Sequence, residues 1–223
     1  DVYKRQVYIV EIYVPSEISK VNLESRGAQP RGYYKVFIDA GHGGTDPGAL
    51  GYGYRESDLN LQVAKKVESK LKSKGIDVKM SRNSDIFYSL SERAEMANDY
   101  GADAFVSIHQ NSAEAKSANG IETYYNRKKE EDRPLSNDIQ KQVISQTGAN
   151  NRGVKNAEFT VLVKSEMISA LVECGFITNE SEVKKLSDPS YQDKLATGIA
   201  DGIEEYLKSN VIIEESQITA VSY

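Results

Sequence analysis

The chain has 223 residues, of which 39% are hydrophobic and 27% are charged, as is typical of a soluble globular protein that buries a core. This length indicates one domain with flanking segments. The net charge of −5 gives no sign of a nucleic-acid-binding surface, and no apolar stretch is long enough to cross a membrane. Cys174 is the only cysteine, which excludes an intramolecular disulfide and leaves the redox compartment open.

Residues 1–34 are expected to form an N-terminal fragment or linker. Within them, Val7–Val14 is rich in β-forming residues and predicts an edge strand or the last strand of another domain. Ser16–Gly32 is polar, contains glycine and proline, and is typical of a linker. The chain begins without a methionine, so the lack of a visible secretory signal carries little meaning.

From Lys35 onward, segments typical of strands and helices alternate. The first expected strand begins at Lys35. The later ones cover Ile76–Met80, Ala104–His109, Ile121–Tyr125 and Ser169–Val172. The expected helices begin at the caps Ser57, Ser89 and Asp188, with a further helix marked by Leu135, Ile139 and Val143. We expect Gly198 and Gly202 to let the last helix pack closely on the sheet.

This alternation predicts a single α/β domain over residues 35–209. Its sheet should be twisted and mostly parallel, with about six strands and with helices on both faces. Residues 210–223 have no clear pattern and are expected to be a C-terminal tail or linker.

The only two histidines, His42 and His109, each end an apolar run that is typical of a buried strand. Ligand sites in parallel sheets lie at the carboxyl ends of strands, so the two imidazoles can meet at one edge. With a carboxylate they would form a zinc site that keeps one coordination position for water. The alternative is two unrelated histidines that are hydrogen-bonded structurally.

Two glutamates are candidates to complete such a site. Glu56 precedes the expected cap Ser57, and from the start of that helix its carboxylate can reach back over the Gly41–Gly44 turn. Glu173 ends the strand Ala170–Val172, where a charged group is costly unless it is paired or functional. Its expected task is to take a proton from water and pass it to a leaving nitrogen.

Five motifs, taken in their order along the chain, resemble those of one known family. They are Ile38–Ala49 (IDAGHGGTDPGA), Glu56–Leu61 (ESDLNL), Ser107–Ser112 (SIHQNS), Gly120–Tyr125 (GIETYY) and Leu171–Asn179 (LVECGFITN). In this order they resemble the zinc-dependent N-acetylmuramoyl-L-alanine amidases of the amidase-3 type, which hydrolyse bacterial peptidoglycan. The resemblance covers roughly residues 35–207.

The resemblance implies an enzyme that hydrolyses the amide between N-acetylmuramic acid and L-alanine. It implies that His42, Glu56 and His109 bind one zinc ion and that Glu173 is catalytic. The partner is then peptidoglycan, and the protein is expected to be a monomer that acts outside the cell or in the cell wall, with a phage-derived cytosolic origin as an alternative.

Other polar residues leave two interpretations open. Asn111 is a candidate to bind substrate or to cap a loop. Arg93, like Arg82, is a candidate to bind a peptide carboxylate, and a structural ion pair is the alternative. Glu122 is expected at a surface strand position, with a place near the substrate groove as the alternative. The Asn111–Gly120 connection is too short for a covering helix, so we expect an open groove.

Two other functions remain as competing hypotheses. A zinc peptidase would cut within the stem peptide, which analysis of the products would reveal. A wall-binding module with a structural metal would not be an enzyme, but structural zinc sites are usually closed by four protein ligands. Cys174 as a nucleophile is a weak alternative, because its side chain should point away from that of Glu173 on an extended strand.

Overall fold

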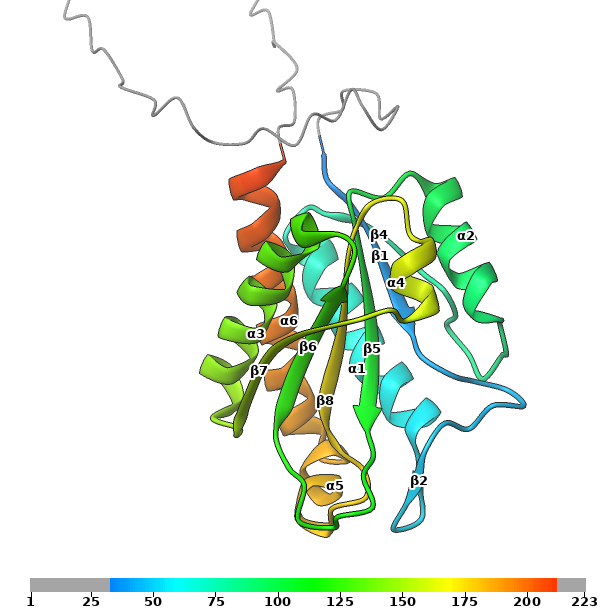
Figure 1. Cartoon of the computed structure of the whole chain (residues 1–223), viewed down its shortest axis with the longest axis vertical. Coiled ribbons are helices and arrows are strands. Elements are labelled where there is room, and N and C mark those ends of the chain that lie inside the picture. Colours follow the sequence, from blue (N-terminus) through cyan, green and yellow to red (C-terminus); the bar gives the residue numbers. More distant parts are fainter. Residues whose placement is uncertain (1–32, 212–223) are drawn as a thin grey trace, which may run out of the picture.

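A six-stranded sheet forms the centre of the computed structural model, which describes residues 33–211 (Figure 1). Its strand order is β4-β1-β5-β8-β6-β7. The strands are β1 (Lys35–Ala40), β4 (Asp77–Met80), β5 (Ala104–Asn111), β6 (Ile121–Asn126), β7 (Asn151–Ala157) and β8 (Ile168–Phe176). A separate two-stranded hairpin consists of β2 (Leu50–Gly51) and β3 (Tyr54–Arg55).

The sheet is mostly parallel, which confirms the predicted fold class. Strands β4, β1, β5 and β8 run in one direction, and β6 is antiparallel to β8. Strand β7 is parallel to β6. The carboxyl ends of β1, β5 and β8 therefore lie at the same edge of the sheet as the amino ends of β6 and β7.

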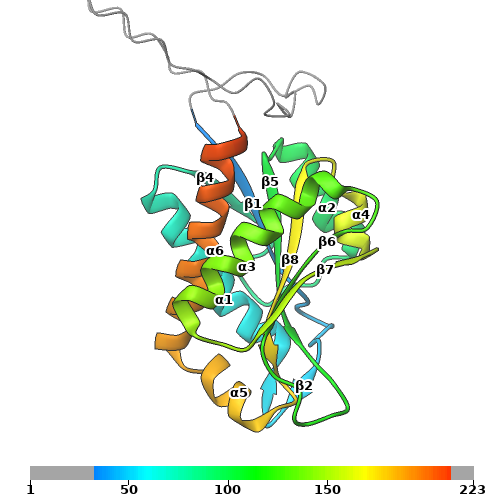
Figure 2. The same ribbon diagram turned by 60° about the vertical axis from the view of Figure 1, so that its left-hand side comes forward.

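One face of the sheet is covered by three long helices, α1 (Glu56–Ser73), α3 (Arg133–Thr147) and α6 (Pro189–Asn210) (Figure 2). Their apolar sides and the alternate strand residues facing them form the larger core cluster. Gly198 and Gly202 allow α6 to pack on α3, because an added Cβ would lie 2.5 Å from Val143 Cα and 2.4 Å from Ile139 Cα. The expectation that these glycines face the sheet was wrong, since they face a neighbouring helix.

The opposite face is covered by α2 (Leu90–Tyr100) and the short helix α4 (Thr160–Lys164). A smaller cluster that includes Phe37, Phe105 and Leu171 forms this second core. No helix lies between β5 and β6 in the chain, as the short connection predicted. The remaining elements are a 3₁₀ helix at Glu130–Asp132 and helix α5 (Glu180–Leu186).

The helix-start signals were largely confirmed. Ser89 and Glu92 form a capping box at α2, and Asp188 caps α6 ahead of Pro189. Helix α1, in contrast, begins at Glu56, and Ser57 lies inside it, where its hydroxyl group has no hydrogen-bond partner among the described residues 33–211. Glu56 is therefore the first residue of the helix. The sequence had indicated instead that Glu56 precedes a helix capped by Ser57.

Some predictions concern segments that the structure does not describe. The possible strand Val7–Val14 and most of both terminal segments lie outside residues 33–211. The expected domain limits, 35–209, remain a prediction. Within the described part, none of the helices has the length and apolar character needed to span a bilayer.

Candidate metal centre

His42 follows β1 in a sharp turn whose backbone is fixed by two buried arginines. Its φ angle of 61° lies in the left-handed region, which non-glycine residues adopt mainly where the surroundings impose it. Arg93 Nη2 donates to the carbonyl oxygen of His42 (2.8 Å), and Arg82 Nη2 donates to that of Gly41 (3.0 Å). These two hydrogen bonds hold the turn so that the imidazole faces Glu56.

Glu56 is buried at the start of α1 and its carboxylate is held from several sides. Oε2 accepts a hydrogen bond from the backbone N–H of Ala49 (2.8 Å). Oε1 accepts from Asn60 Nδ2 (3.2 Å) and from the backbone N–H of Gln110 (3.2 Å). The carboxylate group is thus fixed before any metal binds, which lowers the entropic cost of using it as a ligand.

His109 lies near the end of β5 with its ring packed over Gly41. A Cβ added at Gly41 would lie 2.3 Å from both Cε1 and Nε2 of the ring, so only glycine fits there. The other ring nitrogen, Nδ1, lies 2.9 Å from Glu56 Oε1. Nδ1 is therefore the ring nitrogen of His109 that faces the Glu56 carboxylate.

The three side chains bring one potential ligand atom each to a common region. These atoms all lie within 4.8 Å of one another, and His42 Nε2 is 3.2 Å from Glu56 Oε1. Two imidazole nitrogens and one carboxylate oxygen are a donor set found in catalytic zinc sites, where a fourth position stays open. The residues therefore fit a zinc ion, and the sequence had identified all three.

Asp46 orients His42, a role that was not expected from the sequence, where Asp46 appeared only within the Ile38–Ala49 motif. His42 Nδ1 donates to Asp46 Oδ2 at 2.7 Å. The hydrogen bond fixes the tautomer that leaves Nε2 free for a metal, as carboxylates behind ligating histidines commonly do. The sequence offered only an aspartate four residues after His42 as a signal, and this spacing predicts a contact on a helix but not in a turn.

The electrostatics of the group favour a bound cation. Burial disfavours charge on His42, but Glu56 and Asp46 outweigh it and raise the pKa of His42 to about 9. Burial also disfavours the charge on Glu56, yet hydrogen bonds from His109 and His42 lower the pKa of its carboxyl group well below the usual range. Without a metal the site thus attracts protons, which a divalent cation would displace.

Glu173 lies beside this group, on the strand next to His109. The two residues are direct partners in the parallel pairing of β5 and β8. Burial raises the pKa of Glu173 to about 7; His109 opposes the rise, while Glu56 and Glu122 add to it. Its Oε2 atom is buried and has no hydrogen-bond partner among residues 33–211. A carboxyl group with these properties is suited to move protons near neutral pH.

Glu122 is 2% exposed, so the expected surface position was wrong, while a place near the substrate groove remains a prediction. It is the antiparallel partner of Glu173, which places both side chains on one face of the sheet. Asn111 Nδ2 donates to Glu122 Oε1 (2.5 Å), and Asn111 Oδ1 accepts from the backbone N–H of Ser112 (2.8 Å). Asn111 therefore caps a loop and holds Glu122, while its contact with substrate remains a prediction.

Arg93 makes the structural ion pair that was the alternative to a substrate contact. It is 1% exposed, and its Nη1 atom donates to Asp39 Oδ1 at 2.7 Å. Arg82 is 3% exposed, and within the part of the chain that the structure describes its hydrogen bonds all go to backbone carbonyl oxygens, among them those of Ala40 (2.9 Å) and Ser57 (2.7 Å). These contacts favour a structural role for both arginines.

A pocket of about 540 Å³ opens next to the two histidines, on the side of β1 and α2. Its wall includes apolar groups of Phe87 and Leu90 as well as Thr160. Phe87 and Leu90 are about half exposed and give this wall of the pocket an apolar surface. The metal group thus has a pocket on one side and Glu173 on the other.

Comparison with known proteins identifies the same family as the motifs. Residues 36–205 match the amidase-3 family model, described as N-acetylmuramoyl-L-alanine amidase. The uncharacterized protein YqiI of Bacillus subtilis (strain 168) is 46% identical over 184 residues, which cover 82% of this chain and 89% of YqiI. The N-acetylmuramoyl-L-alanine amidase LytC of the same strain is 43% identical over 175 residues, which are 78% of this chain but only 35% of LytC.

The fold is also shared with solved structures. The crystal structure of N-acetylmuramoyl-L-alanine amidase from Clostridium difficile 630 superposes with a TM-score of 0.78 and is 43% identical. The match covers 79% of this chain and 98% of that one. The mixed sheet and its helices are thus those of this group of enzymes.

Proposed function

Because the chain belongs to the N-acetylmuramoyl-L-alanine amidase family, we propose that it hydrolyses the amide between N-acetylmuramic acid and L-alanine of peptidoglycan with one zinc ion. The observation that carries the zinc dependence is the convergence of His42, Glu56 and His109 ligand atoms within 4.8 Å. The position of Glu173 beside them supports a hydrolytic role for the site.

The proposed ligands are His42 through Nε2, His109 through Nδ1, and the Glu56 carboxylate. When bound, zinc supplies a Lewis acid that polarises the amide carbonyl and favours ionisation of the attacking water. Asp46 keeps His42 in the required tautomer, and the hydrogen bonds to Glu56 keep its carboxylate in place.

Glu173 performs the proton transfers in this proposal. Its carboxylate takes a proton from the attacking water as the water oxygen bonds to the acyl carbon. It then gives that proton to the nitrogen of L-alanine as the carbon–nitrogen bond breaks. The products are the free carboxylate of the muramic acid and a peptide with a free amine.

This proposal also places the protein at the bacterial cell wall, because its polymeric substrate is there. The lack of a covering helix between β5 and β6 supports a groove that accepts a polymer without a protein activator. The isolated domain should therefore cleave purified peptidoglycan on its own. A strict requirement for a second protein would contradict this part of the proposal.

Substitution of Glu173 tests the assignment. Glu173→Gln removes the proton acceptor but keeps the size of the side chain, so the rate should fall by on the order of 10²-fold or more. Zinc content should stay near one ion per chain, because Glu173 is not among the three proposed ligands. Glu166→Gln, which makes the same change on an exposed glutamate, is the matched control. Near-normal turnover of Glu173→Gln with zinc bound would refute the assignment.

A further inference from the structure

A row of polar side chains crosses the sheet on the face that α2 and α4 leave partly uncovered. Register pairing places these side chains on neighbouring strands of one face, in the order His109 (β5), Glu173 (β8), Glu122 (β6), and then Lys155 (β7), which pairs with Tyr124 two residues after Glu122. The metal group lies at one end of this row and β7, an edge strand, lies at the other.

The position of Glu173 gives the substrate a direction along this row. Glu173 delivers the proton to the leaving nitrogen, so that nitrogen must lie on the Glu173 side of the metal group. The peptide that carries the nitrogen then continues toward β6 and β7. The acyl part lies on the opposite side, next to the pocket lined by Phe87 and Leu90.

Two cations stand where the peptide would pass. Lys155 Nζ forms an ion pair with Glu122 Oε2, and Arg152 Nε lies 3.4 Å from the same oxygen. The Glu122 side chain is 3% exposed, whereas Arg152 is 33% and Lys155 39% exposed. The Glu122 carboxylate balances one of the two positive charges in this group of three, and the two cations are its solvent-exposed members.

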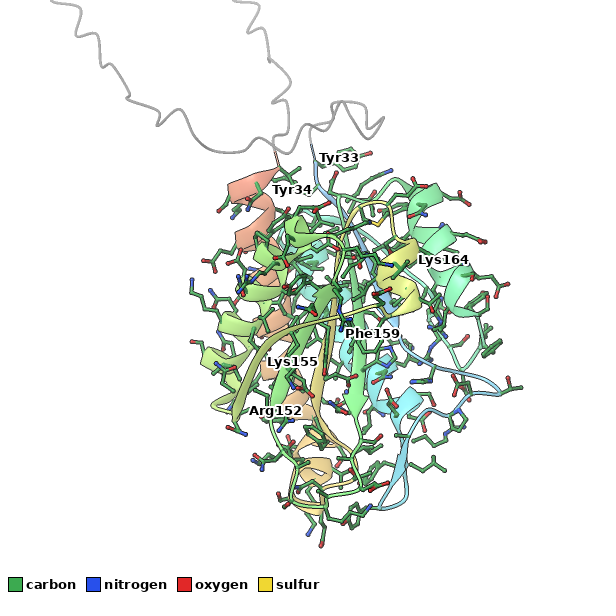
Figure 3. All side chains as sticks on the ribbon, in the orientation of Figure 1. Tyr33, Tyr34, Arg152, Lys155, Phe159 and Lys164 are labelled. Atoms are coloured by element: carbon green, nitrogen blue, oxygen red, sulfur yellow. The ribbon has the colours of Figure 1, made fainter. Side chains whose placement is uncertain are left out.

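Aromatic rings hold this pair in place. The guanidinium group of Arg152 lies 4.8 Å from the centre of the Phe176 ring, and Lys155 Nζ lies 5.9 Å from that of Tyr124. Tyr124 in turn packs against Phe159 with ring centres 5.2 Å apart. Figure 3 shows Arg152, Lys155 and Phe159 in succession along β7 and the segment that leads to α4. The cations are thus oriented before a ligand arrives.

We propose that Arg152 and Lys155 form a carboxylate subsite for the peptide on the leaving-amine side of Glu173, an inference that rests on the proposed amidase function. Strand β7 lies two strand spacings, about 10 Å, from β8, and both cations reach back to Glu122 on the strand between them, so the cationic groups lie roughly 5–10 Å from Glu173. An extended peptide advances about 3.3–3.6 Å per residue. The recognised carboxylate therefore belongs to one of about the first three residues of the peptide.

The test compares two soluble substrates. Both are N-acetylmuramoyl tripeptides that begin with L-alanine and contain glutamate, with all peptide carboxylates free in one and converted to amides in the other. The wild-type enzyme loaded with zinc should show a KM about 10-fold or more higher for the amidated substrate, with a smaller change in kcat. This is the effect expected for loss of a charge-assisted hydrogen bond.

The variants are chosen so that Glu122 is not left buried without a partner. Glu122→Gln keeps both cations and should keep the preference for the free carboxylates. Addition of Arg152→Gln and Lys155→Gln to Glu122→Gln should bring the ratio of the two KM values close to one. Lys164→Gln is the matched control, because Lys164 is a cation of the same face that donates to Ser91 at α2. It should leave the preference unchanged.

The possible results distinguish a failure of the proposed subsite from a failure of the proposed amidase function. If the wild-type enzyme releases the alanine amine from both substrates with equal KM, the amidase function stands and the subsite is refuted. If it cleaves neither substrate at this amide, the proposed function itself fails. If the triple variant keeps its substrate preference but loses binding to cell walls that carry an anionic polymer, the cations serve that polymer and the peptide subsite is refuted.

Discussion

Gly41→Ala offers a sharp test of the metal centre, because the variant places one methyl group against His109. The added Cβ would lie 2.3 Å from the ring, whereas ordinary contacts begin at 3.4 Å, so a shift of about 1.1 Å is needed (3.4 less 2.3). The backbone of Gly41 is unable to retreat, since its N–H donates to Ile108 and its carbonyl oxygen accepts from Arg82 and Asn60. The imidazole ring must move instead.

A displacement of this size exceeds the roughly 0.2 Å within which metal–ligand distances are defined. We expect the affinity of Gly41→Ala for zinc to fall by on the order of 100-fold or more, measured by competition with a chromophoric chelator. The metal-free variant should lose about 1–3 kcal/mol of unfolding free energy from overpacking. Gly101→Ala is the control, because it also places a side chain on a left-handed residue, but its added Cβ would meet no atom within 4 Å, so the zinc affinity should stay unchanged. Wild-type zinc affinity in Gly41→Ala would refute the assigned position of His109.

Three further predictions follow from single contacts. Asp46→Asn weakens the hydrogen bond that orients His42 and should lower zinc affinity by about 10- to 100-fold in the same competition assay; an unchanged affinity would contradict this role. Arg93→Met leaves the buried Asp39 carboxylate without its cation and should cost about 3–5 kcal/mol in urea unfolding, whereas a role in substrate binding alone predicts a higher KM at unchanged stability. Burial raises the pKa of Asp132 to about 6, so its ionisation destabilises the folded state as pH rises from about 4 to 6. Asp132→Asn should therefore gain stability relative to the wild type, by up to about 3 kcal/mol at pH 7.5 and close to nothing at pH 4, and a difference independent of pH would exclude this cause.

The parallel core of the fold could be predicted because its strands are continuous apolar runs bounded by glycine and polar residues. Strand β7 could not, since its sequence Asn151–Ala157 has no alternation of apolar and polar residues and forms an edge of the sheet. Its pairing with β6 depends on tertiary contacts rather than on local preference. The packing partner of Gly198 could not be predicted for the same reason, because it depends on which element the tertiary structure places opposite this glycine.

The candidate ligands could be predicted because His42, His109 and Glu56 stand at element ends that topology brings to one edge. The residues around them were harder to interpret. Asp46 orients His42 through a turn conformation that the composition of the loop does not specify. The buried carboxylate of Glu122 is paired with Arg152 and Lys155, which belong to a strand that the sequence did not reveal. Pairings between distant segments are invisible in a single sequence unless their elements are recognised first.

Mass analysis of peptidoglycan digests tests the central claim most directly. Purified wall fragments are incubated with the enzyme as prepared, after treatment with a chelator, and after one equivalent of zinc is restored. The account predicts peptides with an intact sequence and a free L-alanine amine, lost after chelation and recovered with zinc. Cuts between amino acids would indicate a peptidase, binding without cleavage would indicate a wall-binding module, and release of L-alanine amines that persists in metal-free enzyme would contradict the zinc centre.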